Sequence, residues 1–194
     1  MTTDAKGRTL LWGWVPDFPK GRGWNGCLTL PREVTVTPDG LLAFAPAKEL
    51  EALRGPVGKT PAGNRLEDRS FTFEPRGDSL EINLRFQPGN SKSCGIRLRK
   101  SDDGKRSVSI TYSGNMLDVA GTKIKVDAPD KDDAIALRIF LDHSVLEVYL
   151  PDGRVITKVI SAEPDDLGIE TFATGGWATF GSADVWPMSS AWKE

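Results

Sequence analysis

Three polar residues in the stretch "LDHSVLEVYL" have side chains that could take part in acid–base chemistry. Asp142 and Glu147 could form a pair of catalytic carboxylates, and His143, the only histidine of the chain, could act as a base. The apolar residues of the same stretch and its flank are Ile139, Leu141, Leu146, Val148 and Leu150. Their alternation changes phase around Asp142, which one continuous strand cannot do without a slip. We therefore predict a tight turn over residues 142–144, in which Asp142 accepts backbone N–H bonds.

A second group of candidates is aromatic and lies near the start of the chain. In "LLWGWVPDFPKGRGWNGCLTLPRE", three tryptophans stand among glycines and prolines: Trp12, Trp14 and Trp24. An aromatic face complements the C–H face of a sugar ring, but buried aromatics also remove large areas from water. We favour packing for these rings. Any carbohydrate site should use positions where aromatics cluster near polar groups and glycines, and these candidates are Trp14, Asp17, Trp24 and Trp177.

The sequence predicts no catalytic residue, cofactor site or metal site. Its two cysteines, Cys27 and Cys94, lack metal-ligand spacing and are interpreted as small packed hydrophobes. No serine stands in a Gly-x-Ser-x-Gly elbow, and no phosphate loop or Rossmann glycine pattern occurs.

Composition excludes several classes of partner. The 194 residues carry 25 Lys plus Arg against 27 Asp plus Glu, a net charge of -2, with no basic block that could neutralise a run of phosphates. Apolar runs fall short of the roughly 20 residues that a membrane helix needs, and "MTTDAKGR" has no signal-peptide core behind it. We expect neither nucleic acid nor a membrane as partner, and a cytoplasmic location.

Most of the chain shows the period-2 alternation of β-strands. "SLEINLRF" places four apolar residues on one face and Glu81, Asn83 and Arg85 on the other. Similar segments alternate with turn signals such as "PGNSKS", "SDDGK" and the "PDG" of Pro151 to Gly153. This spacing predicts an all-β fold, an antiparallel two-sheet sandwich.

One segment has a helical period. "PAKELEALRG" puts Pro46 at a first helical position, Leu50 and Leu53 three residues apart, and Gly55 where a helix would end in the left-handed conformation. We predict a short helix here and divide the chain near residue 55.

Longer motifs carry a family resemblance. "GRTLLWGWVPDF" followed by "GRGWNGCLTLPREVTV" and "ELEALR" resembles the end of the catalytic domain of glycoside hydrolase family 32, the invertases, levanases and other β-fructosidases. "LDHSVLEVYLPDGR" resembles the Asp-x-Ser-x-x-Glu-Val-Phe signature of that family's C-terminal sandwich, with Tyr149 in the phenylalanine's place. The resemblance implies a remnant of the last propeller blade over residues 1–45, a linker helix over 46–55 and a lectin- or glucanase-like sandwich module over 56–194.

The same resemblance implies that the chemistry of the family lies elsewhere. Family members hold their active site in a five-bladed propeller, with aspartates in Asn-Asp-Pro-Asn-Gly and Arg-Asp-Pro and a glutamate in Glu-Cys. None of these motifs occurs here, although retaining hydrolysis needs two carboxyl groups about 5–5.5 Å apart. Asp17 matches an acidic position that follows Trp-Gly-Trp in plant invertases and shapes the fructose site, but "VPDF" departs from their Ala-Asn-Glu-Ser.

Three functions fit these observations. The chain is the non-catalytic C-terminal region of a β-fructosidase with a structural or assembly role, a stand-alone carbohydrate-binding module, or half of a split enzyme that needs a propeller partner. We rank them in that order. We expect weak binding of fructan or another carbohydrate at best. We also expect self-association through the apolar strands of residues 8–44 if their propeller neighbours are missing, because unpaired strand edges are templates for another chain.

Overall fold

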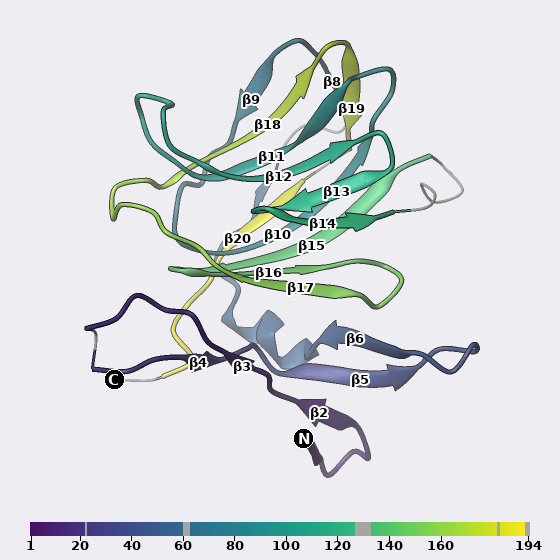
Figure 1. The fold of residues 1–194 in the computed structure, drawn as a ribbon, viewed down its shortest axis with the longest axis vertical. Helices are drawn as coiled ribbons and strands as arrows, with labels where there is room; N and C mark the ends of the chain where they lie inside the picture. The colour runs from purple at the N-terminus through teal and green to yellow at the C-terminus, as the bar shows by residue number, and fades with distance from the viewer. Residues whose placement is uncertain (22, 60–62, 127–132, 182, 193–194) are drawn as a thin grey trace.

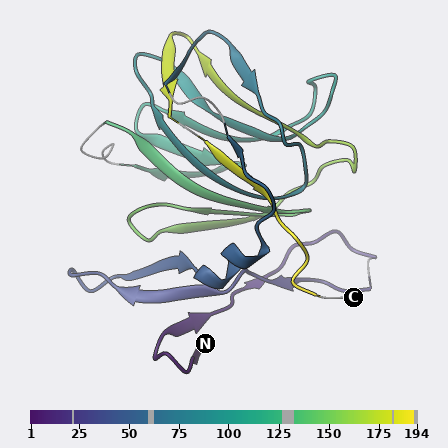
Figure 2. The ribbon, with the colours of Figure 1, turned by 180° about the vertical axis from the view of Figure 1, so that it is seen from behind.

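The computed structural model describes residues 1–21, 23–59, 63–126, 133–181 and 183–192. These residues form an antiparallel β-sandwich with further N-terminal strands beneath it, as Figure 1 shows. The predicted all-β fold is therefore confirmed. The last described residues leave the sandwich on the side where the N-terminal strands lie (Figures 1 and 2).

The sandwich consists of two facing sheets. In order, the first contains β17 (Val155–Val159), β16 (Val145–Tyr149), β15 (Ile135–Asp142), β10 (Ser79–Gln87), β19 (Trp177–Phe180) and β8 (Asn64–Glu67), and β20 (Asp184–Pro187) pairs with β10 and with β7 (Gly58–Lys59). The second contains β14 (Thr122–Lys125), β13 (Met116–Val119), β12 (Val108–Ser113), β11 (Ser93–Lys100), β18 (Gly168–Thr174) and β9 (Ser70–Thr72).

The predicted alternation builds the core between these sheets. In β10, the four apolar residues of "SLEINLRF" are buried: Leu80, Ile82, Leu84 and Phe86. They join residues of β11, β12, β15 and β16 in one hydrophobic cluster. Each fully buried side chain of this size stabilises the fold by roughly 1.5–3 kcal/mol relative to exposure, so the cluster holds the sheets together.

The turn predicted after Leu141 is also confirmed. β15 and β16 form a hairpin in which Asp142 pairs with Val145, and His143 adopts the left-handed conformation at φ 50°. The N–H of His143 donates to the backbone oxygen of Asp78 at 2.7 Å, rather than to the Asp142 side chain as expected. The "PDG" turn joins β16 to β17, with Gly153 at φ 84°.

The helix differs from its prediction. It is a 3₁₀ helix, η1 (Lys48–Leu53), and Pro46 ends the preceding strand instead of starting the helix. Gly55 is not left-handed, because the chain leaves the helix extended: Arg54 pairs with Met188, and the Gly55 N–H donates to Pro187 O at 2.7 Å. Residues three apart share one face of a 3₁₀ helix, so Leu50 and Leu53 both pack toward the sandwich.

The N-terminal strands pack against the outer face of the first sheet. β1 (Thr2–Thr3), β2 (Thr9–Leu11), β5 (Arg32–Val36) and β6 (Leu42–Pro46) form one sheet, and β3 (Trp14–Val15) pairs with β4 (Cys27–Leu28). A small cluster joins this layer and η1 to the sandwich: Leu50 of η1 meets Phe140 and Tyr149, and Leu30 of the layer packs against them. We call residues 1–47 the N-terminal layer.

The two cysteines form no disulfide, and their different burial predicts different reactivity of their thiols. Burial raises the pKa of Cys94 to about 11, whereas Cys27 is only partly buried. A thiolate is the reactive form, so Cys94 in a Cys27→Ser variant should react with iodoacetamide at pH 8 at least about 100-fold more slowly than an ordinary thiol. Mass spectrometry measures the rate, and urea-unfolded protein should restore it. Equal rates in folded and unfolded protein would contradict the buried position. The reverse variant, Cys94→Ser, should react faster.

Candidate functional site

The structure does not bring the four predicted carbohydrate-binding residues together. Trp14 and Trp24 lie in the N-terminal layer, while Trp177 lies on β19 at the opposite end of the sandwich (Figure 1). Trp14 and Trp24 are 60% and 46% exposed, so the prediction that these rings are buried by packing the N-terminal strands against the sandwich is wrong for them. Trp177 is partly buried beneath the guanidinium of Arg65, 4.3 Å from the ring centroid.

The exposed rings are nevertheless held in place. The Trp14 ring lies so close to Gly26 that a Cβ at that position would force the ring to shift. Trp24 meets Phe18 edge to face, with ring centroids 4.7 Å apart. Asp17, beside Phe18, is a non-glycine residue at φ 70° and borders a cleft of about 640 Å³ against the sandwich.

One group of buried charges lies where the N-terminal layer meets the first sheet. Glu147, on the outer face of β16, is 2% exposed. Its Oε1 accepts the Leu30 N–H at 2.7 Å, and its Oε2 accepts Nη2 of Arg32 at 2.7 Å. The hydroxyl of Tyr149 donates to the same Oε2 at 2.7 Å. Both carboxylate oxygens of Glu147 are thus bound to the N-terminal layer or to Tyr149.

The environment keeps the Tyr149 hydroxyl protonated. Burial, together with the negative charge of Glu147, raises the pKa of Tyr149 above its usual range. Its ring also packs edge to face on Phe140 at 5.9 Å between centroids. The Tyr149 hydroxyl therefore stays protonated and donates a hydrogen bond to Glu147.

A second carboxylate, on the neighbouring part of the same face, is held in the same way. Glu81 on β10 is 0% exposed and binds two arginines. Arg54, which follows η1, donates to Oε1 at 2.6 Å and to Oε2 at 2.8 Å, and Arg138 of β15 donates to Oε1 at 2.8 Å. Trp186 of β20 covers the Arg54 guanidinium, 4.1 Å from the ring centroid. We call the groups around Glu147 and Glu81 the two anchors.

The alternative catalytic set does not assemble in the part of the chain that the structure describes. Glu147 is directed to Arg32, while the exposed His143 places Nδ1 2.9 Å from Oδ2 of Asp78. Asp142 is exposed at the end of β15. The hypothesis of a catalytic carboxylate pair with a histidine base is therefore wrong for these three residues, and the two anchors are what sequence reasoning missed.

Among the described residues, no group of three or more His, Cys, Asp or Glu side chains is arranged to hold a metal ion. In the same residues, no helix has the length and apolar character that crossing a membrane requires.

Comparison with known proteins identifies relatives along most of the chain. The model of the family described as "Glycosyl hydrolases family 32 C terminal" matches residues 49–187. The levanase of Bacillus subtilis (strain 168) is 30% identical over a region covering 93% of this chain and 30% of the levanase. The sucrose-6-phosphate hydrolase of Escherichia coli is 28% identical, covering 94% of this chain and 40% of that protein. The chain thus spans less than half the length of these relatives.

Solved structures share the fold. The crystal structure of fructan 1-exohydrolase IIa from Cichorium intybus superimposes with a TM-score of 0.83 at 19% identity, covering 96% of this chain and 46% of that chain. The sucrose-6-phosphate hydrolase from Lactobacillus gasseri gives a TM-score of 0.72 at 20% identity, covering 97% and 40%. The N-terminal layer and the sandwich are both included in these matches, since nearly the whole chain is covered.

The first anchor leads to a stability prediction. Replacing Glu147 by Ala leaves Arg32 buried without its partner, and breaking a buried pair in this way costs about 3–5 kcal/mol. Urea unfolding followed by tryptophan fluorescence measures the change. Glu67→Ala is the matched control, because its pair with Arg65 is exposed and its loss should cost less than about 0.5 kcal/mol. Equal effects of the two variants would show that the anchor does not hold the layer.

Proposed function

Because the chain belongs to glycoside hydrolase family 32, as its C-terminal region, we propose that it has a structural and assembly role and does not itself cleave sugars. The observation that carries the proposal is the pair of buried anchors. Glu147 and Glu81 bind Arg32 and Arg54, which lie outside the sandwich, with N–O distances of 2.7 and 2.6 Å. The N-terminal layer and the linker are therefore fixed to the sandwich in one orientation.

Exposed apolar side chains of the N-terminal layer support a partner for it. The large ones are Trp12, Trp14, Trp24, Leu28, Val36, Leu41 and Leu42. Monomeric proteins rarely expose contiguous apolar areas of large size, and such areas mark interaction sites. The proposed occupant is the remainder of a catalytic propeller, in the same polypeptide or in a separate one, with the anchored strands completing its last blade.

A carbohydrate-binding module is the second candidate function. The exposed rings of Trp14 and Trp24 favour it, since aromatic faces can stack on sugars. Trp177 lies on β19, which is far from β3 and the other N-terminal strands, and this argues against one shared site (Figure 1). A split enzyme, with a separate propeller chain as partner, is the third candidate and uses the same apolar surface as the first.

The proposal predicts that the purified chain releases no fructose from sucrose, inulin or levan. The physical reason is that both oxygens of Glu147 are bound and that the sequence contains none of the three catalytic motifs. Released fructose is measured with a coupled assay. Activity that persists through purification and disappears in an Asp17→Asn variant would contradict the proposal. Activity that appears only after a propeller fragment of a family member is added would favour the split enzyme.

The same apolar surface predicts self-association of the chain on its own. We expect a dimer, because a symmetric pair is the commonest way to cover such a surface. Light scattering measures the mass of the full chain and of a Leu28→Glu, Leu42→Glu double variant, in which two exposed apolar residues become charged. The variant should be monomeric. Lys123→Glu, on the exposed edge of the sandwich, serves as control and should not change the mass. A monomeric unmodified chain at high concentration would contradict self-association.

A further inference from the structure

The cleft beside Asp17 contains a buried side chain with unused hydrogen-bonding capacity. The cleft has a volume of about 640 Å³ and lies between the loop of residues 15–19, the turn at His143 and the segment of residues 157–164. Arg99, from the second sheet, forms part of its wall, and the side chain of Arg99 is 5% exposed. A guanidinium so well covered normally has partners for its N–H groups.

Local backbone geometry explains how Arg99 comes to this position. The pairing of β11 with β18 shifts register between Arg97 and Lys100, and Arg99 adopts the left-handed conformation at φ 49°. Arg97 and Lys100 both reach Glu170 on the outer face, while Leu98 is buried in the core. The irregularity lets Arg99 leave the ladder and turn toward the cleft. A non-glycine residue in this conformation costs of order 1–3 kcal/mol, and such strain clusters at functional positions.

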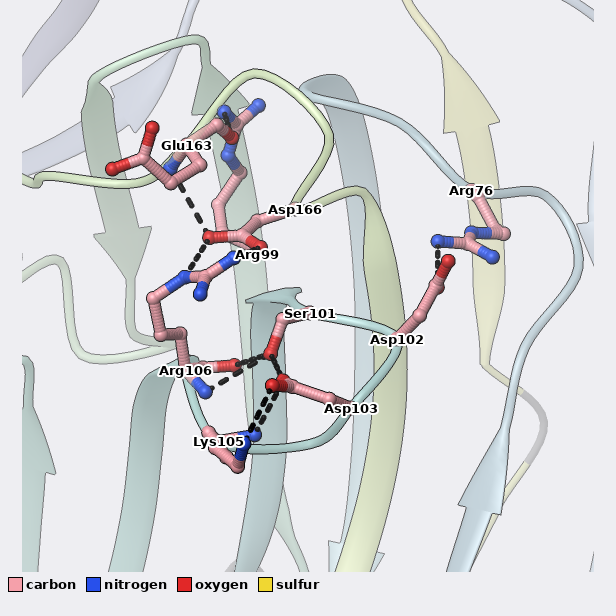
Figure 3. Close-up of polar contacts among 9 residues, drawn as sticks. All are labelled: Arg76, Arg99, Ser101, Asp102, Asp103, Lys105, Arg106, Glu163 and Asp166. Atoms are coloured by element: carbon pink, nitrogen blue, oxygen red, sulfur yellow. Dashed lines mark hydrogen bonds and ion pairs between the residues drawn. The ribbon is translucent and has the colours of Figure 1, made fainter.

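The contacts of Arg99 leave part of its guanidinium unsatisfied. Nη2 donates to the backbone oxygen of Glu163 at 2.9 Å, as Figure 3 shows. Nη1 lies 3.1 Å from Oδ2 of Asp78, an ion-pair distance, but among the residues that the structure describes neither Nη1 nor Nε has a hydrogen-bond partner. A buried donor left in this way costs about 1–3 kcal/mol, which a ligand oxygen could recover.

The wall around Arg99 is rigidly built. Asp166 binds Arg106 through both oxygens, at 2.8 and 3.0 Å, and accepts the Glu163 N–H at 3.1 Å (Figure 3). These contacts fix the carbonyl to which Arg99 donates. The position of Arg99 is thus set before any ligand arrives, which reduces the entropy lost on binding.

Both hydrogen-bond acceptors and hydrogen-bond donors line the cleft. Asp78 accepts from His143, and burial raises its pKa, but the hydrogen bond from His143 and the positive charge of Arg99 outweigh burial and hold that pKa below its usual value. Asp17 stands on the facing loop, and Lys158 lies along the edge. The two carboxylates would repel an anion, and Arg99 and Lys158 would repel a cation. A hydroxyl group is uncharged and can both donate and accept hydrogen bonds, so it suits both kinds of side chain.

We propose that this cleft binds an uncharged sugar through adjacent hydroxyl groups, with Arg99 as the donor and Asp78 and Asp17 as the acceptors. Phe18 and Pro164 supply apolar surface for the C–H groups of the ring. His143 covers Asp78 from the solvent side and moves aside when the sugar enters, because its side chain is largely exposed and is held there by the contact of Nδ1 with Asp78. The site does not include Trp14, Trp24 or Trp177.

NMR titration of the full-length chain with the neutral trisaccharide 1-kestose tests the proposal. The Nε–H signal of Arg99 and the backbone signals of Asp78 and His143 should shift together and saturate. Asp17→Asn and His143→Asn keep residues that tolerate the left-handed conformation, so both variants should fold. Asp17→Asn should weaken binding about fivefold or more, as should Arg99→Lys, which keeps the charge but loses the planar fork. His143→Asn should bind at least as well as the unmodified chain.

The controls separate this site from the other candidates. Asp152→Asn makes the same chemical change at a turn bordering a different cleft and should leave the affinity within about twofold. Trp14→Ala and Trp177→Ala should do the same. Shifts confined to the tryptophans, or an unaltered affinity in Asp17→Asn, would overturn the proposal. Tighter binding of inorganic phosphate than of 1-kestose at the Arg99 signal would also overturn it in favour of an anion site. None of these outcomes depends on the assembly role.

Discussion

Two buried carboxylates determine how this molecule is put together. Glu147 and Glu81 project from the outer face of the first sheet, where a sandwich that stood alone would present them to water. In the structure both are almost completely covered, and a covered carboxylate is strongly destabilising unless a positive charge and hydrogen bonds accompany it. The charges come from Arg32 of the N-terminal layer and from Arg54, which follows η1, so the segments that cover the carboxylates also neutralise them.

This arrangement makes the contact specific as well as tight. The apolar part of the contact, in which Leu50 meets Phe140 and Tyr149, is small and would tolerate some sliding. The forked contacts of arginine with a carboxylate do not, because two N–H groups must meet oxygens at fixed spacing. Glu147 adds the backbone N–H of Leu30 to its partners, which fixes the strand entering the layer as well as the side chain of Arg32.

The sequence predicted the sandwich well because its signals are local. Alternation in "SLEINLRF", the phase change after Leu141 and the "PDG" turn each depend on a few neighbouring residues, and the structure contains all three. Alternation also placed Glu81 and Glu147 outward correctly. It could not distinguish an outward face that meets water from one that another layer covers, since that depends on partners 27 and 115 residues away in sequence. The end of the helix was mispredicted for the same reason, because Arg54 and Gly55 follow contacts with residues 187 and 188.

The exposure of the tryptophans could not be predicted for the same reason, because it depends on which surfaces another layer covers. Trp14 and Trp24 look like core residues by type, yet they are 60% and 46% exposed in the N-terminal layer. The layer therefore combines two unlike parts: Arg32 is committed to the sandwich by a buried ion pair, while a set of apolar side chains stays open to solvent. Buried charge pairs resist separation because one charge would then remain buried without its partner. An apolar surface, in contrast, accepts any partner of complementary shape. A segment built in this way can change what it binds through its exposed apolar side chains without loosening its attachment to the sandwich, which is the property that a support for a larger assembly requires.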